Sequence, residues 1–298
     1  MKKVIDVSKS EYLSLFLGNL IVKKEQSKII IPINDIETII FENNRMAISI
    51  PLINDLIEKK VNIIFCDYKH MPIAQIIPFN GYFDNKVFAS QLSWDDKYKA
   101  KTWQLIIKLK ILNSKNLIEN LIPDDISTIE NLSNYFEDVK IMDLSNREGH
   151  AAKVYFKSIF GKDFIREKEN ANDYINIYLN YGYSVLMSYV SRSLVSKGFD
   201  NRISVFHKSF NNNVPLACDL VEPLRCIVDN LVYKFVLKKN SKIESNFKDY
   251  KEELFLYLQQ HIVVNNKQMK IIDYIDYLTK GILENRDIKE LAIDWSSK

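Results

Sequence analysis

The spacing of the apolar residues changes once along this chain of 298 residues, and that change constrains the fold more than any other feature. Before residue 78 the apolar residues come in short β-rich runs bounded by turn residues, which predicts strands. After residue 85 they recur at intervals of three and four, which predicts helices with one buried face. The chain is therefore expected to be an α+β protein, with a small N-terminal β-rich domain followed by a larger all-helical domain.

The change of period also predicts the domain boundaries. We expect a β-rich domain over 1–78, a linker over 79–85 that contains Gly81, and a helical domain over 86–298. In the first domain, strands are expected at 12–17, 20–23, 28–31, 36–41, 61–65 and 73–77, with a turn at Gly18-Asn19 and a helix over 47–59. In the second domain, we expect a long helix over 90–121 and a charged, helical tail over 240–298.

Composition gives weaker constraints. The formal charge of +3, from 41 basic and 38 acidic residues, is too balanced to indicate a nucleic-acid-binding protein, so a DNA-binding surface would need local clusters of basic residues. The three cysteines have no Cys-x-x-Cys spacing and follow no secretory segment, which indicates a reducing cytoplasm. The longest uncharged run, 174–191, carries a polar residue every four positions, which predicts an amphipathic helix rather than a membrane span.

One stretch, 201–226, combines residues with metal-binding chemistry. His207 precedes three consecutive asparagines, and Asp219 and Glu222 follow Pro215 at the predicted start of an apolar helix. Asp-x-x-Glu before an apolar run is typical of a capping box, and the positive end of a helix favours carboxylates in any case. An imidazole and two carboxylates on either side of a short connection also have the chemistry of a metal site. Taken alone, capping is the more common explanation.

A second stretch adds a third candidate ligand. Glu148 precedes Gly149 inside an otherwise helix-forming segment, where glycine costs about 1 kcal/mol relative to alanine. That cost indicates that another group approaches the backbone there. Glu148, His207 and Glu222 would together offer two carboxylates and one imidazole. This set suits Mg²⁺ or Mn²⁺ holding a phosphate better than a closed zinc site.

Basic residues flank this candidate site in the sequence. Two groups occur, one on the predicted long helix and one after Glu148: Lys97, Lys99, Lys101, Lys108 and Lys110, then Lys153, Lys157, Lys162, Arg166 and Lys168. Arg225, shortly after Glu222, is a further candidate. A solvated helix face and a surface that follows DNA phosphates explain these charges equally well.

These motifs together resemble the CRISPR adaptation integrases, which insert foreign DNA fragments into a CRISPR array. The resemblance covers nearly the whole chain, is closest to the type II versions, and rests on Arg147-Glu148-Gly149-x-Ala151-Ala152, His207, residues 215–225 and Leu179-Asn180-Tyr181-Gly182-Tyr183. It implies that Glu148, His207 and Glu222 bind one divalent ion, with acidic Asp219 beside them. It also implies a homodimer formed through the N-terminal part, and a small dimeric CRISPR-associated partner protein that bridges two dimers.

The predicted chemistry is phosphoryl transfer on DNA. A divalent ion at these ligands would polarise a phosphate oxygen and neutralise the charge that develops in the reaction. Attack by water would cut DNA, whereas attack by a 3′-hydroxyl would join a foreign fragment to a CRISPR repeat. The residues do not choose between these reactions, and the resemblance favours integration. The alternatives are a metal-dependent nuclease acting on branched DNA in repair, and a structural DNA-bridging subunit.

Overall fold

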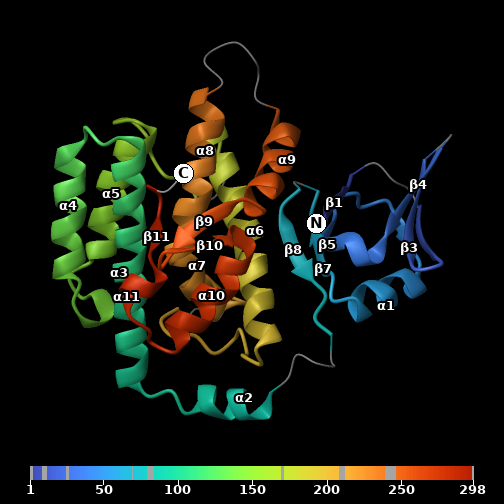
Figure 1. Cartoon of the computed structure of the whole chain (residues 1–298), viewed down its shortest axis with the longest axis horizontal. Coiled ribbons are helices and arrows are strands. Elements are labelled where there is room, and N and C mark those ends of the chain that lie inside the picture. The colour runs from blue at the N-terminus through green and yellow to red at the C-terminus, as the bar shows by residue number, and fades with distance from the viewer. Residues whose placement is uncertain are drawn as a thin grey trace. The chain divides into compact units, whose positions relative to one another are not determined.

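A computed structural model describes residues 3–8, 12–24, 27–68, 70–78, 84–168, 171–207, 212–238 and 246–296. The chain divides into two compact units, Met1–Tyr82 and Phe83–Lys298. The first unit is β-rich and the second is mostly helical (Figure 1), which confirms the predicted fold class. Residues 79–83 of the predicted linker lie outside the described residues, and Asn85 already begins the first helix of the second unit.

Two four-stranded sheets form the β-rich unit. One has the order β1 (Lys3–Val7), β5 (Ile36–Phe41), β7 (Asn62–Cys66) and β8 (Pro72–Gln75). The other has the order β4 (Ser27–Pro32), β3 (Asn19–Lys24), β2 (Tyr12–Phe16) and β6 (Ala47–Ile48). Helix α1 (Ile50–Glu58) contributes Leu52 and Leu56 to a core that also contains Leu13 of β2 and Ile39 of β5. Leu52 and Leu56 are thus buried, on the helix that the sequence predicted in this region.

The first hairpin differs in detail from the prediction. Its turn is formed by Leu17 and Gly18, with φ angles of 48° and 69°, rather than by Gly18 and Asn19. Positive φ at both positions matches the twist of two paired strands. Asn19 instead begins β3, and its side-chain amide donates to the carbonyl oxygens of Phe16 and Leu17 at 3.2 and 2.8 Å. This amide holds the non-glycine residue Leu17 in the turn.

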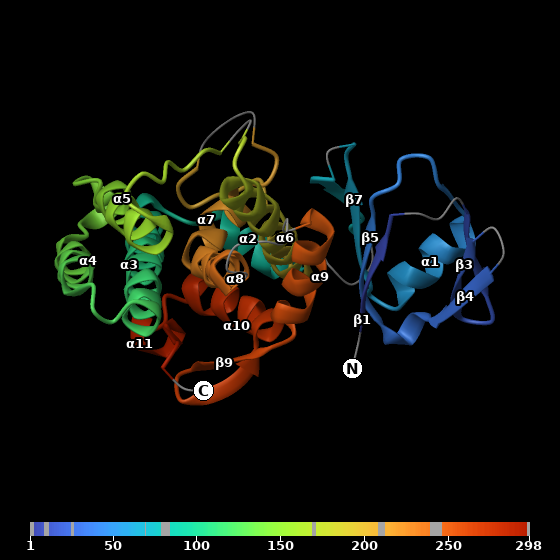
Figure 2. The same ribbon diagram turned by 90° about the horizontal axis from the view of Figure 1, so that it is seen from above.

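The helical unit is built around one long helix, α3 (Asp96–Leu121). The single helix predicted over 90–121 is divided into α2 (Asn85–Leu92) and α3, because the Asp95 carboxylate accepts from the backbone N–H of Tyr98 at 2.7 Å and caps α3. Helices α4 (Ile126–Asp138) and α5 (Arg147–Phe160) lie beside α3 in both ribbon views (Figures 1 and 2). The remaining helices are α6 (Tyr174–Ser196), α7 (Pro215–Val221), α8 (Arg225–Lys238), α9 (Phe247–Leu258), α10 (Ile271–Leu283) and α11 (Ile288–Leu291).

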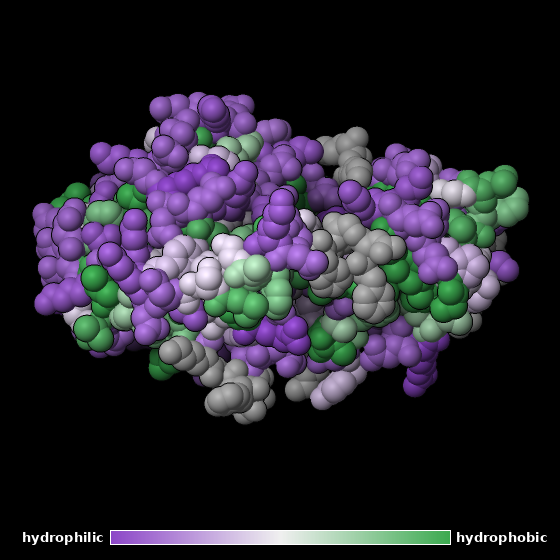
Figure 3. Space-filling model, turned by 90° about the horizontal axis from the view of Figure 1, so that it is seen from below, coloured by the Kyte–Doolittle hydropathy of each residue, from purple (hydrophilic) through white to green (hydrophobic). Residues whose placement is uncertain are grey.

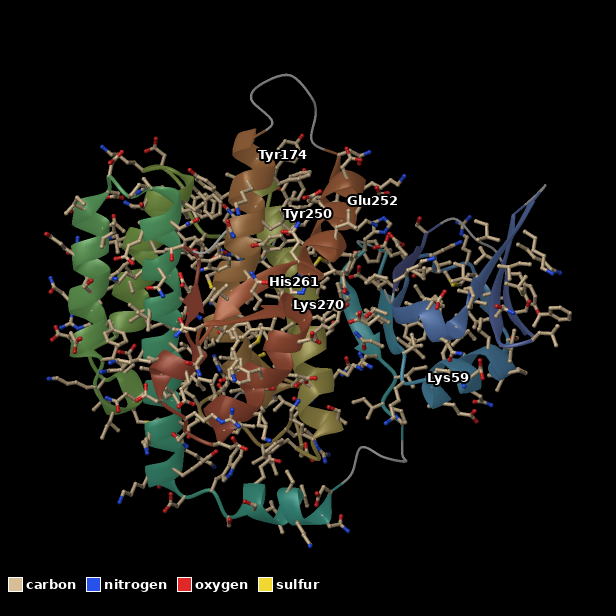
Figure 4. All side chains as sticks on the ribbon, viewed as in Figure 1. Lys59, Tyr174, Tyr250, Glu252, His261 and Lys270 are labelled. Carbon is tan, nitrogen blue, oxygen red and sulfur yellow. The ribbon has the colours of Figure 1, made fainter. Side chains whose placement is uncertain are left out.

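The sequence predicts a helical C-terminal tail, but the tail also contains strands. Strands β9 (His261–Val264), β10 (Lys267–Lys270) and β11 (Ile293–Asp294) form a small antiparallel sheet. His261 and Lys270, labelled in Figure 4, are the paired ends of its hairpin. Asn265 and Asn266 turn the chain with φ angles of 50° and 57°. This two-residue asparagine turn is the local signal that the helical interpretation overlooked.

Helices α6 and α8 approach closely at Gly182. A Cβ atom there would lie 2.5 Å from Cγ1 of Val228 and 2.7 Å from the hydroxyl of Tyr250 on α9, which Figure 4 labels. No larger residue fits without moving these neighbours. The close packing at Gly182 places the next residue, Tyr183, beside Asp229 of α8.

In the part of the chain that the structure describes, no helix has the length and apolar character to cross a membrane.

Candidate active site

Three charged side chains from separate elements meet on one side of α3. The ammonium of Lys110 lies 2.5 Å from Oε1 of Glu148, in the first turn of α5. It also lies 2.6 Å from Oε2 of Glu222, which begins the short 3₁₀ helix η3 (Glu222–Leu224). The two carboxylates therefore share one cation. The structure brings together two of the three predicted ligands, around a lysine of the chain itself.

Local structure explains the position of Glu148. The carboxylate of Asp143 accepts from the backbone N–H groups of Arg147 at 2.8 Å and Glu148 at 3.0 Å, and so fixes the first turn of α5. A Cβ atom on Gly149 would lie 2.7 Å from Oδ1 of Asn146, whose backbone is left-handed with φ of 51°. The group that approaches the backbone at Gly149 is therefore the Asn146 side chain, from the turn that leads into the helix.

The capping-box interpretation of Asp219 and Glu222 is wrong. Helix α7 already begins at Pro215, so Asp219 lies inside a helix and not at its start. The Glu222 carboxylate accepts hydrogen bonds from the side chain of Arg225, at 3.0 Å from Nε and 2.8 Å from Nη2, and from Lys110. Glu222 is thus held by two cations.

Helix α3 also fixes the backbone around Glu222. Asn113, one turn after Lys110, is fully buried. Its amide donates to the carbonyl oxygen of Pro223 at 2.9 Å, and its own oxygen accepts from the backbone N–H of Ile293 at 2.9 Å. Because residues three apart share a helix face, α3 presents an ammonium and an amide to the same short turn.

Electrostatics keep this cluster ionised. Burial acts to lower the pKa of Lys110, but the carboxylates of Glu222 and Glu148 outweigh burial and raise it. Burial likewise acts to raise the pKa of Glu222, whereas Arg225 and Lys110 hold it well below its usual range. The same pairing raises the pKa of Arg225 against the effect of burial. All three side chains are therefore charged at neutral pH.

His207 is anchored by Asp219. Asp219 is fully buried, and its oxygens accept from the backbone N–H groups of Val205 at 2.7 Å, Phe206 at 2.9 Å and His207 at 3.2 Å. Oδ1 also lies 2.6 Å from Nδ1 of His207. This hydrogen bond raises the pKa of His207, against the effect of partial burial. With Nδ1 bonded to Asp219, Nε2 is the ring nitrogen left to act as a ligand.

The loop that carries His207 rests on α3. The rings of Trp103 and Phe206 stack with centroids 4.1 Å apart and planes at 4°, and the His207 ring stands edge-on to Trp103 at 5.8 Å. Residues 208–211, which include the first of the three predicted loop asparagines, lie outside the described residues. The long helix α3 thus supports both the Lys110 cluster and the His207 loop.

A divalent metal ion fits the carboxylate pair in its chemistry. The Lys110 ammonium is already one cation shared by Glu148 and Glu222. Carboxylate oxygens are also the ligands that Mg²⁺ prefers. Among the described residues, however, no three His, Cys, Asp or Glu side chains are grouped closely enough to hold a metal. His207 is therefore not assembled with the carboxylates, although both of them help to raise its pKa.

A pocket of about 460 Å³ opens beside the cluster. Its lining contains Lys110, Glu148 and Glu222, and adds basic and aromatic side chains that include Lys153, Phe156, Lys157, Arg166, Lys168, Tyr183 and Arg225. The Arg225 guanidinium also lies over the Tyr183 ring, 4.6 Å from its centroid. The pocket thus combines the carboxylates of Glu148 and Glu222, and a third acidic side chain, Asp229, with a basic wall.

The predicted DNA-binding lysines divide into two groups. Lys153 and Lys157 line the pocket. Lys97 and Lys101 are exposed on the first turns of α3, outside the pocket lining. Lys108 lies over the ring of Phe136 on α4, 5.0 Å from its centroid, and so contributes to packing between helices. The structure therefore joins Lys153 and Lys157 to the candidate site, but not Lys97, Lys101 or Lys108.

Sequence reasoning missed an acidic residue in the pocket wall. Asp229 of α8 is buried and accepts hydrogen bonds from the hydroxyls of Tyr155, at 2.8 Å, and Tyr183. Burial raises the pKa of Asp229 to about 6, although the two tyrosines act to lower it. Asp229 is seven residues after Glu222, two helical turns on, and this spacing was its one signal in the sequence.

Comparison with known proteins agrees with the motifs. A family model described as CRISPR associated protein Cas1 matches residues 6–266. The CRISPR-associated endonuclease Cas1 of Neisseria meningitidis serogroup C (strain 8013) is 30% identical over 285 residues, which cover 94% of this chain and 92% of the relative. A solved casposase bound to integration product has a TM-score of 0.74 at 19% identity, over 100% of this chain and 94% of that chain. A chain of a Cas6-RT-Cas1–Cas2 complex has a TM-score of 0.73 at 16% identity, over 100% of this chain and 36% of that chain.

Proposed function

The chain belongs to the CRISPR associated protein Cas1 family, and we propose that it is a divalent-metal-dependent DNA integrase that inserts foreign DNA fragments into a CRISPR array. The observation that carries this proposal is the pair Glu148 and Glu222, which share one cation in the lining of a pocket with a basic wall. The carboxylates suit a metal, and the wall suits the phosphates of DNA.

In this proposal Glu148 and Glu222 would hold Mg²⁺ or Mn²⁺, with Nε2 of His207 as a third ligand brought in by the metal. The ion would act as a Lewis acid that stabilises charge on the phosphate under attack. Asp219 keeps the His207 ring oriented through Nδ1, and Arg225 keeps Glu222 ionised. Lys153 and Lys157 hold phosphates of the DNA end, which aligns the end for in-line displacement.

The reaction is proposed to be strand transfer, with the 3′-hydroxyl of the foreign fragment attacking the CRISPR repeat. The casposase with a matching fold is bound to an integration product, which supports this choice. The Neisseria relative is named an endonuclease, and hydrolysis of branched DNA in repair is the competing reaction of the same site. Incubating a labelled fragment, a repeat duplex, the partner protein and Mn²⁺ should give mainly joined products. Cut ends without joined ends would favour the nuclease, and no product would favour a structural subunit.

The pocket lysines give a prediction about salt. If Lys153 and Lys157 each neutralise one phosphate, the double variant K153A/K157A should lower the slope of log affinity against log salt by about 1–2 on duplex DNA. The matched control is K97A/K101A, which removes two exposed lysines outside the pocket and should leave the slope unchanged. Fluorescence anisotropy at several salt concentrations measures both slopes. A lower slope in the control alone would place the DNA along the start of α3 instead.

We also propose that the chain works as a homodimer with DNA and a partner of the Cas2 kind. The solved Cas6-RT-Cas1–Cas2 complex supports such a partner. Support for the dimer comes from the β-rich unit, where exposed apolar side chains (green in Figure 3) lie on the edge strand β4, on β2 and in the turn after β2: Tyr12, Phe16, Leu17, Ile29 and Ile30. An edge strand with apolar residues pairs readily with a second copy.

Light scattering should therefore report about 70 kDa, twice the chain mass of 34.9 kDa. The variant F16D/I30D should shift the mass to that of a monomer, because it places charges in the apolar patch. I73D is a suitable control, since Ile73 is 66% exposed on β8 of the other sheet. A monomeric wild type at micromolar concentration would contradict the dimer.

A further inference from the structure

We propose that Lys110 is a built-in substitute for the divalent ion: its ammonium occupies the cation position between Glu148 and Glu222 and leaves when the metal binds. This inference rests on the proposed function, because it assumes that the carboxylates are metal ligands. The inference adds that the metal ion must displace Lys110 from the position between the two carboxylates. The strength of that competition would set the concentration of Mg²⁺ or Mn²⁺ that the protein needs.

The geometry of the cluster carries the first step. Two carboxylate oxygens within 2.5 and 2.6 Å of one nitrogen are held closely enough to share a single small cation. The side chain of Glu222 is 8% exposed and that of Glu148 is 31% exposed. Two partly desolvated carboxylates at this separation repel each other unless a cation lies between them. Lys110 therefore stabilises the metal-free site, and a metal ion would occupy the same place.

The second step is that Lys110, rather than Arg225, is the cation that moves. Arg225 makes two hydrogen bonds to Glu222 and lies over the Tyr183 ring, so its guanidinium is fixed on two sides. Among the described residues, the hydrogen bonds recorded for the Lys110 ammonium go to Glu148 and Glu222 alone. The Lys110 side chain has a flexible stem of four carbons, and it lines the pocket. The released ammonium would therefore stay in the pocket.

The charge balance gives the consequence. Without metal, Glu148 and Glu222 are balanced by Lys110 and Arg225, and the four side chains sum to zero. A divalent ion brings the sum to plus two and frees Lys110 to face the pocket. Metal binding would thus turn a neutral site into one that attracts phosphate, and by linkage a bound DNA end would strengthen metal binding.

The test measures metal affinity directly. Mn²⁺ binding is followed by electron paramagnetic resonance in wild type, K110M and K115M, without DNA. Methionine keeps the unbranched stem but carries no charge, so K110M should bind Mn²⁺ about tenfold more tightly. K115M is the matched control, because Lys115 lies on the same helix and pairs with Glu119 at 2.6 Å, away from the pocket lining. Unchanged or weaker binding by K110M would overturn the inference.

A second measurement needs no variant. Lysine acetylation followed by mass spectrometry should show Lys110 protected in the metal-free protein and reactive after Mg²⁺ is added, whereas Lys115 should not change. Equal labelling of Lys110 with and without Mg²⁺ would contradict its displacement. Failure of the proposed function looks different. If wild type binds no Mn²⁺, or if E148A binds it as well as wild type does, the carboxylates are not metal ligands and the premise itself falls.

Discussion

Replacing Glu222 by alanine should lower the rate of strand transfer by at least about 10²–10³-fold, the scale of losing one electrostatic stabiliser of a transition state. E148A should have a similar effect, because both carboxylates are proposed to hold the same ion. DNA affinity should not fall. Glu222 partly neutralises Lys110 and Arg225, and in E222A only Lys110 keeps a carboxylate partner, Glu148. The variant therefore adds one net positive charge to the pocket wall and should bind DNA at least as tightly as wild type.

Strand transfer is measured with a labelled 3′-end and a repeat duplex, and affinity with the same fragment in anisotropy. E119A is the matched control, since Glu119 pairs with Lys115 on the exposed side of α3 and its loss should change neither quantity. E222Q keeps the shape of the side chain while removing its charge, which tests whether a loss of activity reflects folding. Wild-type activity in both E148A and E222A would rule out the proposed ligands.

The family and the fold class could be predicted from the sequence because both rest on patterns that local chemistry imposes. The family is confirmed by the match over residues 6–266. Short apolar runs rich in β-branched residues mark strands whichever strand they pair with, and the positions of β5 and β7 follow from such runs. The exact turn residues are harder to predict from the sequence. The Leu17-Gly18 turn depends on hydrogen bonds from the Asn19 side chain, which turn propensities do not include.

The contacts inside the site could not be predicted in the same way. Lys110 is 38 residues before Glu148 and 112 before Glu222, and only the packing of α3 against α5 and η3 brings the three together. Asp219 was expected beside the metal ligands, and its role as the acceptor for a distant loop depends on the path of that loop. A glycine in a helix signals a close approach, but not that Asn146 is the neighbour. Sequence patterns identify the groups, and packing selects their partners.

Asp219 should matter for stability as much as for chemistry. D219A removes a fully buried acceptor of three backbone N–H groups and of the His207 ring. Each buried donor left without a partner costs about 1–3 kcal/mol, and the N–H groups of Phe206 and His207 are only partly buried, so the free energy of unfolding should fall by roughly 3–5 kcal/mol. The His207 ring also loses its orientation, which should weaken Mn²⁺ binding by about 10–100-fold.

The comparison that isolates this role is H207A. That variant loses the ring, the proposed third metal ligand, but keeps the three backbone hydrogen bonds of Asp219, so it should bind Mn²⁺ poorly while retaining most of the stability that D219A loses. Urea unfolding of the two variants measures the difference. If D219A is no less stable than H207A, the backbone hydrogen bonds of Asp219 do not support the loop.

The pH dependence of stability gives an independent check on the same pair. Because the hydrogen bond to Asp219 raises the pKa of His207 above that of an unfolded chain, the folded protein holds the ring proton more tightly. This contribution to stability is fully present below the unfolded pKa of about 6.5 and is lost as the pH rises through the folded value. Stability should therefore fall with rising pH across that window in the wild type. The same decline should be absent in H207A and reduced in D219A, since a ring without Asp219 has lost the main cause of its raised pKa.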